Sequence, residues 1–191
     1  DRAEENNPDD VEKVLELSRA KEPKPESAKL EDGFTMLVAG PEHAEQMSEV
    51  YRVVFETYPF PIHEPEYIRE TMETHVVYFA VYDGDRMVAV ASSEMDEDAS
   101  NVEMTDFATL PDYRGRGLAV YLLYEMEKEM QKRGIATAYT IARAVSAGMN
   151  ITFAKLGYKF AGTLVNNTDI SGGMESMNVW YKPLLDGRKE S

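Results

Sequence analysis

The stretch Asp106–Leu123, DFATLPDYRGRGLAVYLL, constrains the fold and function of this chain more than any other. It begins as a strand-like apolar run, breaks at a Leu-Pro-Asp sequence and continues into a helical pattern. The first backbone N–H groups of a helix have no internal partner, and the helix dipole adds positive potential, so such a junction binds anions. Gly115 and Gly117 let a ligand approach the backbone, and Arg114 and Arg116 supply charge suited to phosphate. The stretch therefore predicts a pyrophosphate cradle.

The composition predicts one substantial domain, since 43% of the 191 residues are hydrophobic and 29% are charged. The absence of cysteine excludes disulfides, thiolate metal ligands and a cysteine nucleophile. It also fits a reducing compartment, so we expect a cytoplasmic protein. His43, His63 and His75 lack ligand spacing, so we expect no metal. No apolar run is long enough to span a bilayer, and we expect no membrane partner.

The charge distribution narrows the class of partner. A net charge of −15 argues against nucleic acid and favours cationic ligands. Residues 83–112 carry nine acids against one base, whereas residues 114–143 carry six bases against three acids. We therefore expect a basic, phosphate-facing half beside an acidic half, although most of these charges are expected to lie on solvated faces.

The pattern along the chain predicts an α/β fold with a mixed sheet of about seven strands and about four flanking helices. The expected strands are Phe34–Ala39, Val76–Tyr82, Arg86–Met95, Asn101–Thr109, Ala136–Ala142, Tyr158–Val165 and Ser176–Leu184. The expected helices are Pro41–Thr57, Glu64–Thr74, Gly117–Arg133 and Ala144–Leu156. Short turns make the first half antiparallel, whereas the strand–helix–strand unit in the middle requires a parallel central pair that splays apart at a ligand site.

Composition divides the chain into three segments. Residues 1–33 are expected to form an appended helix, capped by Asn7, and a polar linker, residues 34–185 the main domain, and residues 186–191 a polar tail. The sequence does not decide whether the appendage belongs to a larger upstream region. Two segments are expected as loops that close a small pocket: Tyr58–Pro61, with its two prolines, and the polar run Asn166–Gly173.

The motifs in the central stretch identify a family resemblance. No GxxxxGK[ST] or GxGxxG pattern is present; instead Arg114-x-x-Gly117-x-Ala119 resembles the acetyl-CoA motif of the GNAT superfamily of N-acyltransferases. The later Lys155-Leu156-Gly157-Tyr158 supports the resemblance, which covers residues 34–184. It implies direct transfer of an acetyl group from acetyl-CoA to an amine. The cofactor-binding residues that it implies are Phe107, Ala108, Thr109, Arg114, Gly115, Arg116, Gly117, Leu118, Ala119, Asn150 and Phe153.

The amine must lose a proton before it attacks, and two carboxylates are candidates for this step. Glu103 lies where some members of the family carry a general-base glutamate, and a partly dry cleft can raise a carboxyl pKa toward neutrality. Asp106 is the alternative base. In a regular strand its side chain would lie on the opposite face from that of Glu103, but in the family this strand often carries a bulge, which would change the face on which Asp106 lies. One of them acts as the base, directly or through water, while the other holds the cationic substrate, with Tyr58 as a further substrate contact.

The chain departs from the family pattern at the leaving group. Phe153 stands where many family members carry a tyrosine that protonates the thiolate, and Ser146 stands where an asparagine often contacts pantetheine. Asn150 is expected to take over cofactor binding, with Phe153 packed against it. The sequence leaves open whether Tyr158, water or no group supplies the proton.

Three blocks refine the acceptor: residues 104–111, 142–157 and 166–183 resemble the β-lysine N-acetyltransferases. The resemblance implies a small cationic amine or amino acid as the substrate, and synthesis of the osmolyte Nε-acetyl-β-lysine. The acidic half of the charge distribution agrees with such a substrate. Two other functions stay open: acetylation of protein or peptide amines, and a non-catalytic module that binds acetyl-CoA. The sequence also leaves a homodimer possible.

Overall fold

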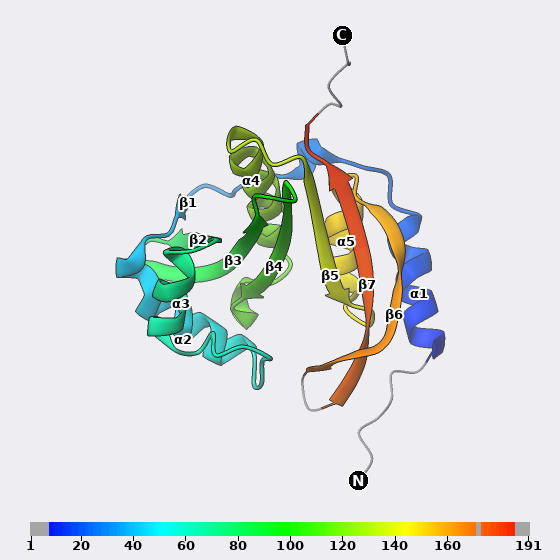
Figure 1. Cartoon of the computed structure of the whole chain (residues 1–191), viewed down its shortest axis with the longest axis horizontal. Coiled ribbons are helices and arrows are strands. Elements are labelled where there is room, and N and C mark those ends of the chain that lie inside the picture. Colours follow the sequence, from blue (N-terminus) through cyan, green and yellow to red (C-terminus); the bar gives the residue numbers. More distant parts are fainter. Residues whose placement is uncertain (1–7, 171–172, 186–191) are drawn as a thin grey trace.

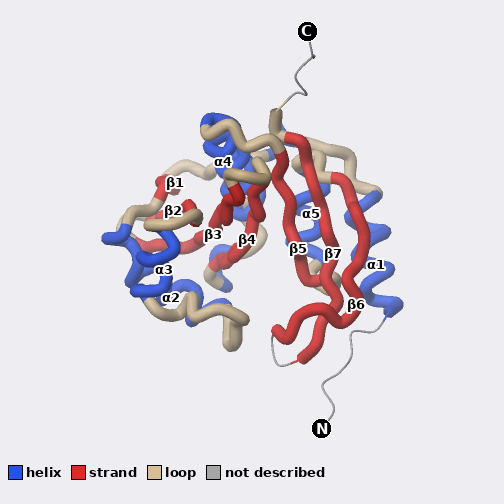
Figure 2. Tube along the Cα trace, in the orientation of Figure 1, coloured by secondary structure: helices blue, strands red, loops and turns tan. Residues whose placement is uncertain are grey.

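The computed structural model describes residues 8–170 and 173–185, and the predicted tail 186–191 and the predicted cap Asn7 lie outside these ranges. One mixed sheet forms the centre of the molecule (Figure 1). Figure 2, coloured by secondary structure, shows the helices packed around this sheet. The strands are β1 (Phe34–Val38), β2 (Val76–Asp83), β3 (Arg86–Asp96), β4 (Asn101–Thr109), β5 (Thr137–Arg143), β6 (Lys159–Ile170) and β7 (Gly173–Pro183). Their order is β1-β2-β3-β4-β5-β7-β6, so β7 is inserted between β5 and β6.

The predicted parallel central pair is confirmed, because β4 and β5 are parallel while the other neighbouring strands are antiparallel. Backbone pairing between them covers only Asn101↔Thr137 to Glu103↔Tyr139. Beyond this point the two strands diverge, and the hydroxyl of Thr140 donates to the carbonyl of Met104 at 2.8 Å. The divergence leaves backbone groups of both strands available to a ligand.

Five α-helices surround the sheet within the described residues: α1 (Pro8–Arg19), α2 (Ala44–Val54), α3 (Pro65–Met72), α4 (Leu118–Lys132) and α5 (Ala147–Lys155). Both α2 and α4 contact β3 and β4. Because β3 is buried on both faces from Met87 to Ser93, these helices cover opposite sides of it. Leu118, Leu122 and Met126 recur at helical spacing on the buried side of α4, which explains why this segment packs there.

The appended helix α1 packs on α5. Val14 and Ser18 of this helix are buried, and the hydroxyl of Ser18 donates to the carbonyl of Val14 at 2.7 Å. The linker that follows is fixed by the N–H of Lys24, which donates to the carbonyl of Lys155 at 2.7 Å. No helix within residues 8–170 and 173–185 is long and apolar enough to cross a membrane.

The prediction of a loop at Asn166–Gly173 is wrong, because strand pairing extends through most of this segment. Thr168 pairs with Glu175, and Ile170 with Gly173. A register shift between Leu164 and Thr168, with Asn166 in the left-handed region at φ 44°, absorbs the extra residues as a bulge. The polar composition therefore reflects a solvent-exposed edge hairpin and not the absence of pairing.

Candidate functional site

The phosphate loop, residues 111–117, joins β4 to α4 in a conformation that requires glycine. Gly115 and Gly117 have φ values of 78° and 75°, in the left-handed region. A Cβ at either position would meet no atom within 4 Å, so there is space for a ligand against the backbone. The first hydrogen bond into α4 runs from Tyr121 N–H to the carbonyl of Gly117 at 3.0 Å. The preceding N–H groups therefore have no helical partner and can bind an anion.

This loop forms one end of a cleft of about 710 Å³ between the diverging strands, here called the main cleft. Its walls come from β4, β5, α4, α5 and the segment after α2. The lining residues are Val54, Phe55, Tyr58, Thr105, Asp106, Phe107, Thr109, Tyr113, Arg114, Gly115, Gly117, Leu118, Ala119, Val120, Thr140, Ile141, Ala142, Arg143, Ser146, Gly148, Met149, Ile151, Thr152, Phe153, Lys155 and Met177. The phosphate loop and the residues predicted to bind the acceptor thus share one cavity.

Most of the predicted cofactor residues line the main cleft: Phe107, Thr109, Arg114, Gly115, Gly117, Leu118, Ala119 and Phe153. Ala108, Arg116 and Asn150 do not. Ala108 is buried within β4. The guanidinium of Arg116 lies over the ring of Tyr113 at 5.3 Å and within 3.9 Å of Glu31 Oε2. Arg116 therefore braces the loop from outside, whereas Arg114 contributes charge to the cleft.

Asn150 has a structural position that the sequence did not predict. Its side chain is fully buried, and its amide nitrogen donates to the carbonyls of Arg143 and Ser146 at 3.0 and 2.8 Å. Its oxygen accepts from Asn178 Nδ2 at 3.0 Å and from Trp180 Nε1 at 2.8 Å. These bonds join α5 to β5 and β7 and fix the backbone at the end of β5, and Asn150 does not line the main cleft.

Phe153 is buried at the floor of the cleft, where its ring meets that of Phe107 edge-on at 5.8 Å. On its other side it meets Tyr158 at 4.9 Å. Tyr158 does not line the cleft, and its ring lies 5.7 Å from the Nζ of Lys182. Burial, reinforced by the charge of Glu127, raises the pKa of Tyr158 well above its usual value. Tyr158 is therefore not placed to protonate a thiolate in the cleft.

The bulge considered at Asp106 is present. Asp106 has φ 53°, and the pairing of β3 with β4 shifts register between Val90 and Ser92. The shift turns the Asp106 carboxylate toward Tyr58, whose hydroxyl donates to Oδ1, and toward Ser92, whose hydroxyl donates to Oδ2 at 2.5 Å. Burial raises the pKa of Asp106, while the bonds from Ser92 and Tyr58 act in the opposite direction.

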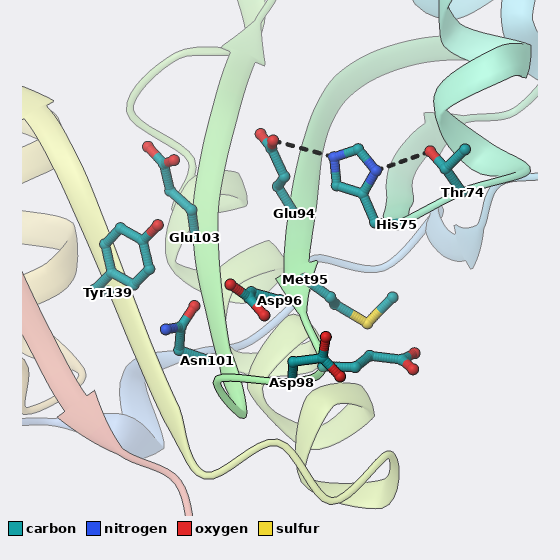
Figure 3. Close-up of a pocket in the computed structure, with 10 residues that line it drawn as sticks. Thr74, His75, Glu94, Met95, Asp96, Asp98, Asn101, Glu103 and Tyr139 are labelled. Carbon is teal, nitrogen blue, oxygen red and sulfur yellow. Dashed lines mark hydrogen bonds and ion pairs between the residues drawn. The ribbon is translucent and has the colours of Figure 1, made fainter.

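Glu103 lies in a second cavity of about 660 Å³, the acidic pocket (Figure 3). Its lining residues are Thr74, His75, Glu94, Met95, Asp96, Glu97, Asp98, Asn101, Glu103 and Tyr139. Glu94 is the cross-strand partner of Glu103, and its oxygen lies 3.2 Å from His75 Nε2. Burial, followed by the charges of Glu94 and Asp106, raises the pKa of Glu103 to about 7.

Ser92, Glu94, Glu103 and Tyr139 lie on one side of the sheet, the acidic face, and Asp106 joins them through its bond to Ser92. Ser92, Glu94 and Tyr139 were not among the predicted site residues. Alternation along β3 and the short turn before β4 would have placed Glu94 opposite Glu103. In the described part of the chain, no group of three or more His, Asp or Glu side chains is placed to hold a metal ion.

Comparison with known proteins identifies close relatives. Beta-lysine N(6)-acetyltransferase of Methanococcus maripaludis is 52% identical over 154 residues, which are 81% of this chain and 56% of that protein. Beta-lysine N(6)-acetyltransferase of Methanosarcina mazei is 40% identical over 175 residues, covering 90% of this chain and 65% of that protein. The chain thus spans little more than half of the first relative and just under two thirds of the second.

A solved structure shares the fold. The ribosomal-protein-S18-alanine N-acetyltransferase from Escherichia coli superimposes with a TM-score of 0.70 at 19% identity, covering 83% of this chain and 99% of that one. The model of the acetyltransferase (GNAT) family matches residues 44–158, which include the bulged strand, the phosphate loop and α5. From this match and the geometry of the cleft, the chain belongs to the acetyltransferase (GNAT) family.

Proposed function

We propose that this chain transfers an acetyl group from acetyl-CoA to a primary amine of a small cationic amino acid, with β-lysine as the preferred acceptor. The observation that carries the proposal is the convergence of two sites at one bulge in β4. The phosphate loop and Asp106 line the main cleft, and Glu103 lines the acidic pocket. The carboxylates of Asp106 and Glu103 both lie on the acidic face. Such an arrangement suits a phosphate-bearing thioester and a positively charged amine that meet at the sheet.

The residues of the main cleft fit the donor. Its diphosphate would lie against Gly115, Gly117 and the N-terminus of α4, where the backbone leaves room, with Arg114 beside it. Its pantetheine amides would bond to the edge of β4 near Phe107 and Thr109, where β5 no longer pairs. The thioester supplies an activated acetyl group, and the protein positions it and excludes water.

The acidic face fits the acceptor. The carboxylate of Asp106, which accepts hydrogen bonds from Tyr58 and Ser92, would bind the ammonium group of the acceptor. Glu103 would take the proton of the amine through water, since its pKa of about 7 suits a general base at neutral pH. The acidic pocket around Glu103 is open to solvent, which gives the proton a route away from the site.

We assign no general acid to the departing thiolate. Phe153 has no proton to give, and Tyr158 lies outside the main cleft. A thiol has a pKa of about 8.5, so its thiolate is a competent leaving group near neutral pH without a proton donor.

Two sequence relatives support β-lysine as the acceptor, since both are beta-lysine N(6)-acetyltransferases and one shares 52% identity. The test is a release assay for free CoA with β-lysine, α-lysine, a diamine and lysine-containing peptides, followed by the mass of each product. We expect the highest kcat/KM with β-lysine and a product that carries one acetyl group. A preference for peptides, or binding of acetyl-CoA with no turnover on any amine, would refute the proposal.

A further inference from the structure

We infer that Arg143 binds the carboxylate of the acceptor and thereby selects amino acids over simple diamines, an inference that rests on the proposed function. Arg143 is the last residue of β5 and lines the main cleft. The carboxylates at the bulge explain how an amine is held, but they repel an acidic group. An acceptor that carries both an ammonium and a carboxylate therefore needs a cation at some distance from the bulge.

Arg143 lies on the acidic face of the sheet. Along β5 the half-exposed residues alternate with buried ones, so that Tyr139, Ile141 and Arg143 share one face. Tyr139 lines the acidic pocket together with Glu103. Because β5 pairs in parallel with β4 as far as Glu103 and Tyr139, Arg143 lies further along this face, where the two strands no longer pair.

The main cleft contains only three basic side chains among its described lining residues: Arg114, Arg143 and Lys155. Arg114 belongs to the phosphate loop, and Lys155 ends α5. Arg143 is the one of the three that shares a strand face with Tyr139. It is therefore the basic group best placed to meet an acceptor whose amine lies at Asp106.

The guanidinium is held in one orientation with part of its bonding capacity unused. Nε donates to Glu175 Oε2 at 2.6 Å and Nη2 donates to Oε1 at 2.5 Å. Within the described residues no hydrogen bond reaches Nη1, so its N–H groups can serve a ligand. The Glu175 side chain is only 11% exposed, whereas that of Arg143 is 36% exposed. Glu175 thus acts as a positioning residue, and Arg143 presents its free edge.

The backbone around this pair is equally fixed. The carbonyl of Arg143 accepts from Asn150, and the N–H of Ala144 donates to the carbonyl of Ser176 at 2.8 Å. Arg143 pairs with Met177 across the strands, and both line the cleft. This rigidity lowers the entropy that Arg143 would lose on binding a carboxylate.

Matched acceptors test the inference directly. We would measure kcat/KM for β-lysine, its carboxamide and cadaverine, with wild-type protein and with Arg143→Gln. We expect wild type to prefer β-lysine over the carboxamide by about 10- to 100-fold, as for loss of a charge-assisted hydrogen bond. In Arg143→Gln the value for β-lysine should fall by that factor, mainly through KM, while the carboxamide and cadaverine change less than about twofold.

Two further variants distinguish recognition from a structural role. Arg143→Lys keeps a charge but loses the fork, and should recover part of the preference for β-lysine; it also serves as the test if Arg143→Gln does not fold. Glu175→Gln should raise KM for β-lysine more than for cadaverine. Equal losses of kcat/KM on all acceptors in Arg143→Gln, or no carboxylate preference in wild type, would overturn the inference. In either case, turnover of β-lysine by wild type would still uphold the proposed function. Lack of wild-type turnover with β-lysine would overturn both.

Discussion

Replacement of Glu103 by glutamine should lower activity and raise stability at the same time. Glu103 is largely buried beside Glu94 and Asp106, and its pKa rises from 4.5 to about 7. A shift of this size corresponds to about 3 kcal/mol, at about 1.4 kcal/mol for each pKa unit. The ionised form that a general base requires is therefore the form that the fold disfavours.

Proton binding determines how the stability contribution of Glu103 changes with pH. Because the pKa of Glu103 is higher in the folded state, the folded protein binds more protons than the unfolded chain between about pH 4.5 and pH 7. This contribution to the free energy of unfolding is complete at low pH, falls as the pH rises through that window, and levels off above about pH 7. Glutamine does not ionise, so at about pH 8 the Glu103→Gln protein should be more stable than wild type by up to about 3 kcal/mol.

The catalytic effect has the opposite direction. Loss of a general base lowers kcat by about 100-fold or more. In wild type kcat/KM should rise with pH through about 7, and this inflection should be absent from Glu103→Gln. Glu94→Gln provides the matched control, since it removes the charge across the strand, keeps the base, and should move the inflection to lower pH.

The assay combines urea unfolding at about pH 5 and pH 8 with steady-state kinetics over the same range. At the lower pH the stability difference between wild type and Glu103→Gln should shrink to a small fraction of its value at the higher pH. Wild-type turnover in Glu103→Gln at about pH 8 would remove Glu103 from the mechanism. An equal stability difference at both pH values would refute the raised pKa itself.

Three other substitutions test separate parts of the site. Gly117→Ala adds a Cβ to a left-handed residue and to the space against the phosphate loop, so CoA affinity by calorimetry should fall about tenfold or more; Gly84→Ala, also left-handed and unobstructed, should cost similar stability without this loss. Asn150→Ala leaves two buried donors of β7 without a partner and should lower the free energy of unfolding by about 3 kcal/mol, while the folded variant keeps CoA affinity within about twofold. Tyr58→Phe removes one of the hydroxyls that stabilise the Asp106 carboxylate, so KM for the amine should rise about threefold to tenfold, and affinity for CoA should stay unchanged. Loss of CoA binding in Asn150→Ala, or an unchanged KM in Tyr58→Phe, would contradict the roles assigned here.

Local chemistry made much of the fold and the phosphate loop predictable from the sequence. Gly115 and Gly117 occur between a strand pattern and a helix pattern. The strand-to-helix junction and the left-handed conformation of these glycines both depend on neighbouring residues in the sequence. The insertion of β7 between β5 and β6 was not predictable in this way, because strand order depends on contacts between distant segments. The prediction of a loop at Asn166–Gly173 was wrong because a strand at the edge of a sheet can be as polar as a loop.

The site residues were harder to predict where their properties depend on partners across the sheet. Burial first, and then the charge of Glu94 on a neighbouring strand, raises the pKa of Glu103, and the pattern of β4 alone reveals neither the depth of burial nor the neighbour. Asn150 was predicted to take over cofactor binding because Ser146 stands where the family often carries an asparagine, whereas its hydrogen bonds go to β5 and β7. In each case sequence position located the residue correctly in the fold, whereas burial and partners determined what it can contact.

The candidate chemistry depends on irregular backbone at one end of β4. A regular strand would point Asp106 away from Ser92 and would continue its pairing with β5. The bulge turns the carboxylate onto the acidic face, and the divergence of β5 opens the strand edge to a ligand. A left-handed residue other than glycine costs roughly 1–2 kcal/mol, which the hydrogen bonds from Tyr58 and Ser92 offset. Because these bonds hold the carboxylate that would meet the amine, the bulge and the acceptor site stabilise each other, and a change that restored regular pairing at Asp106 would abolish the site without unfolding the sheet.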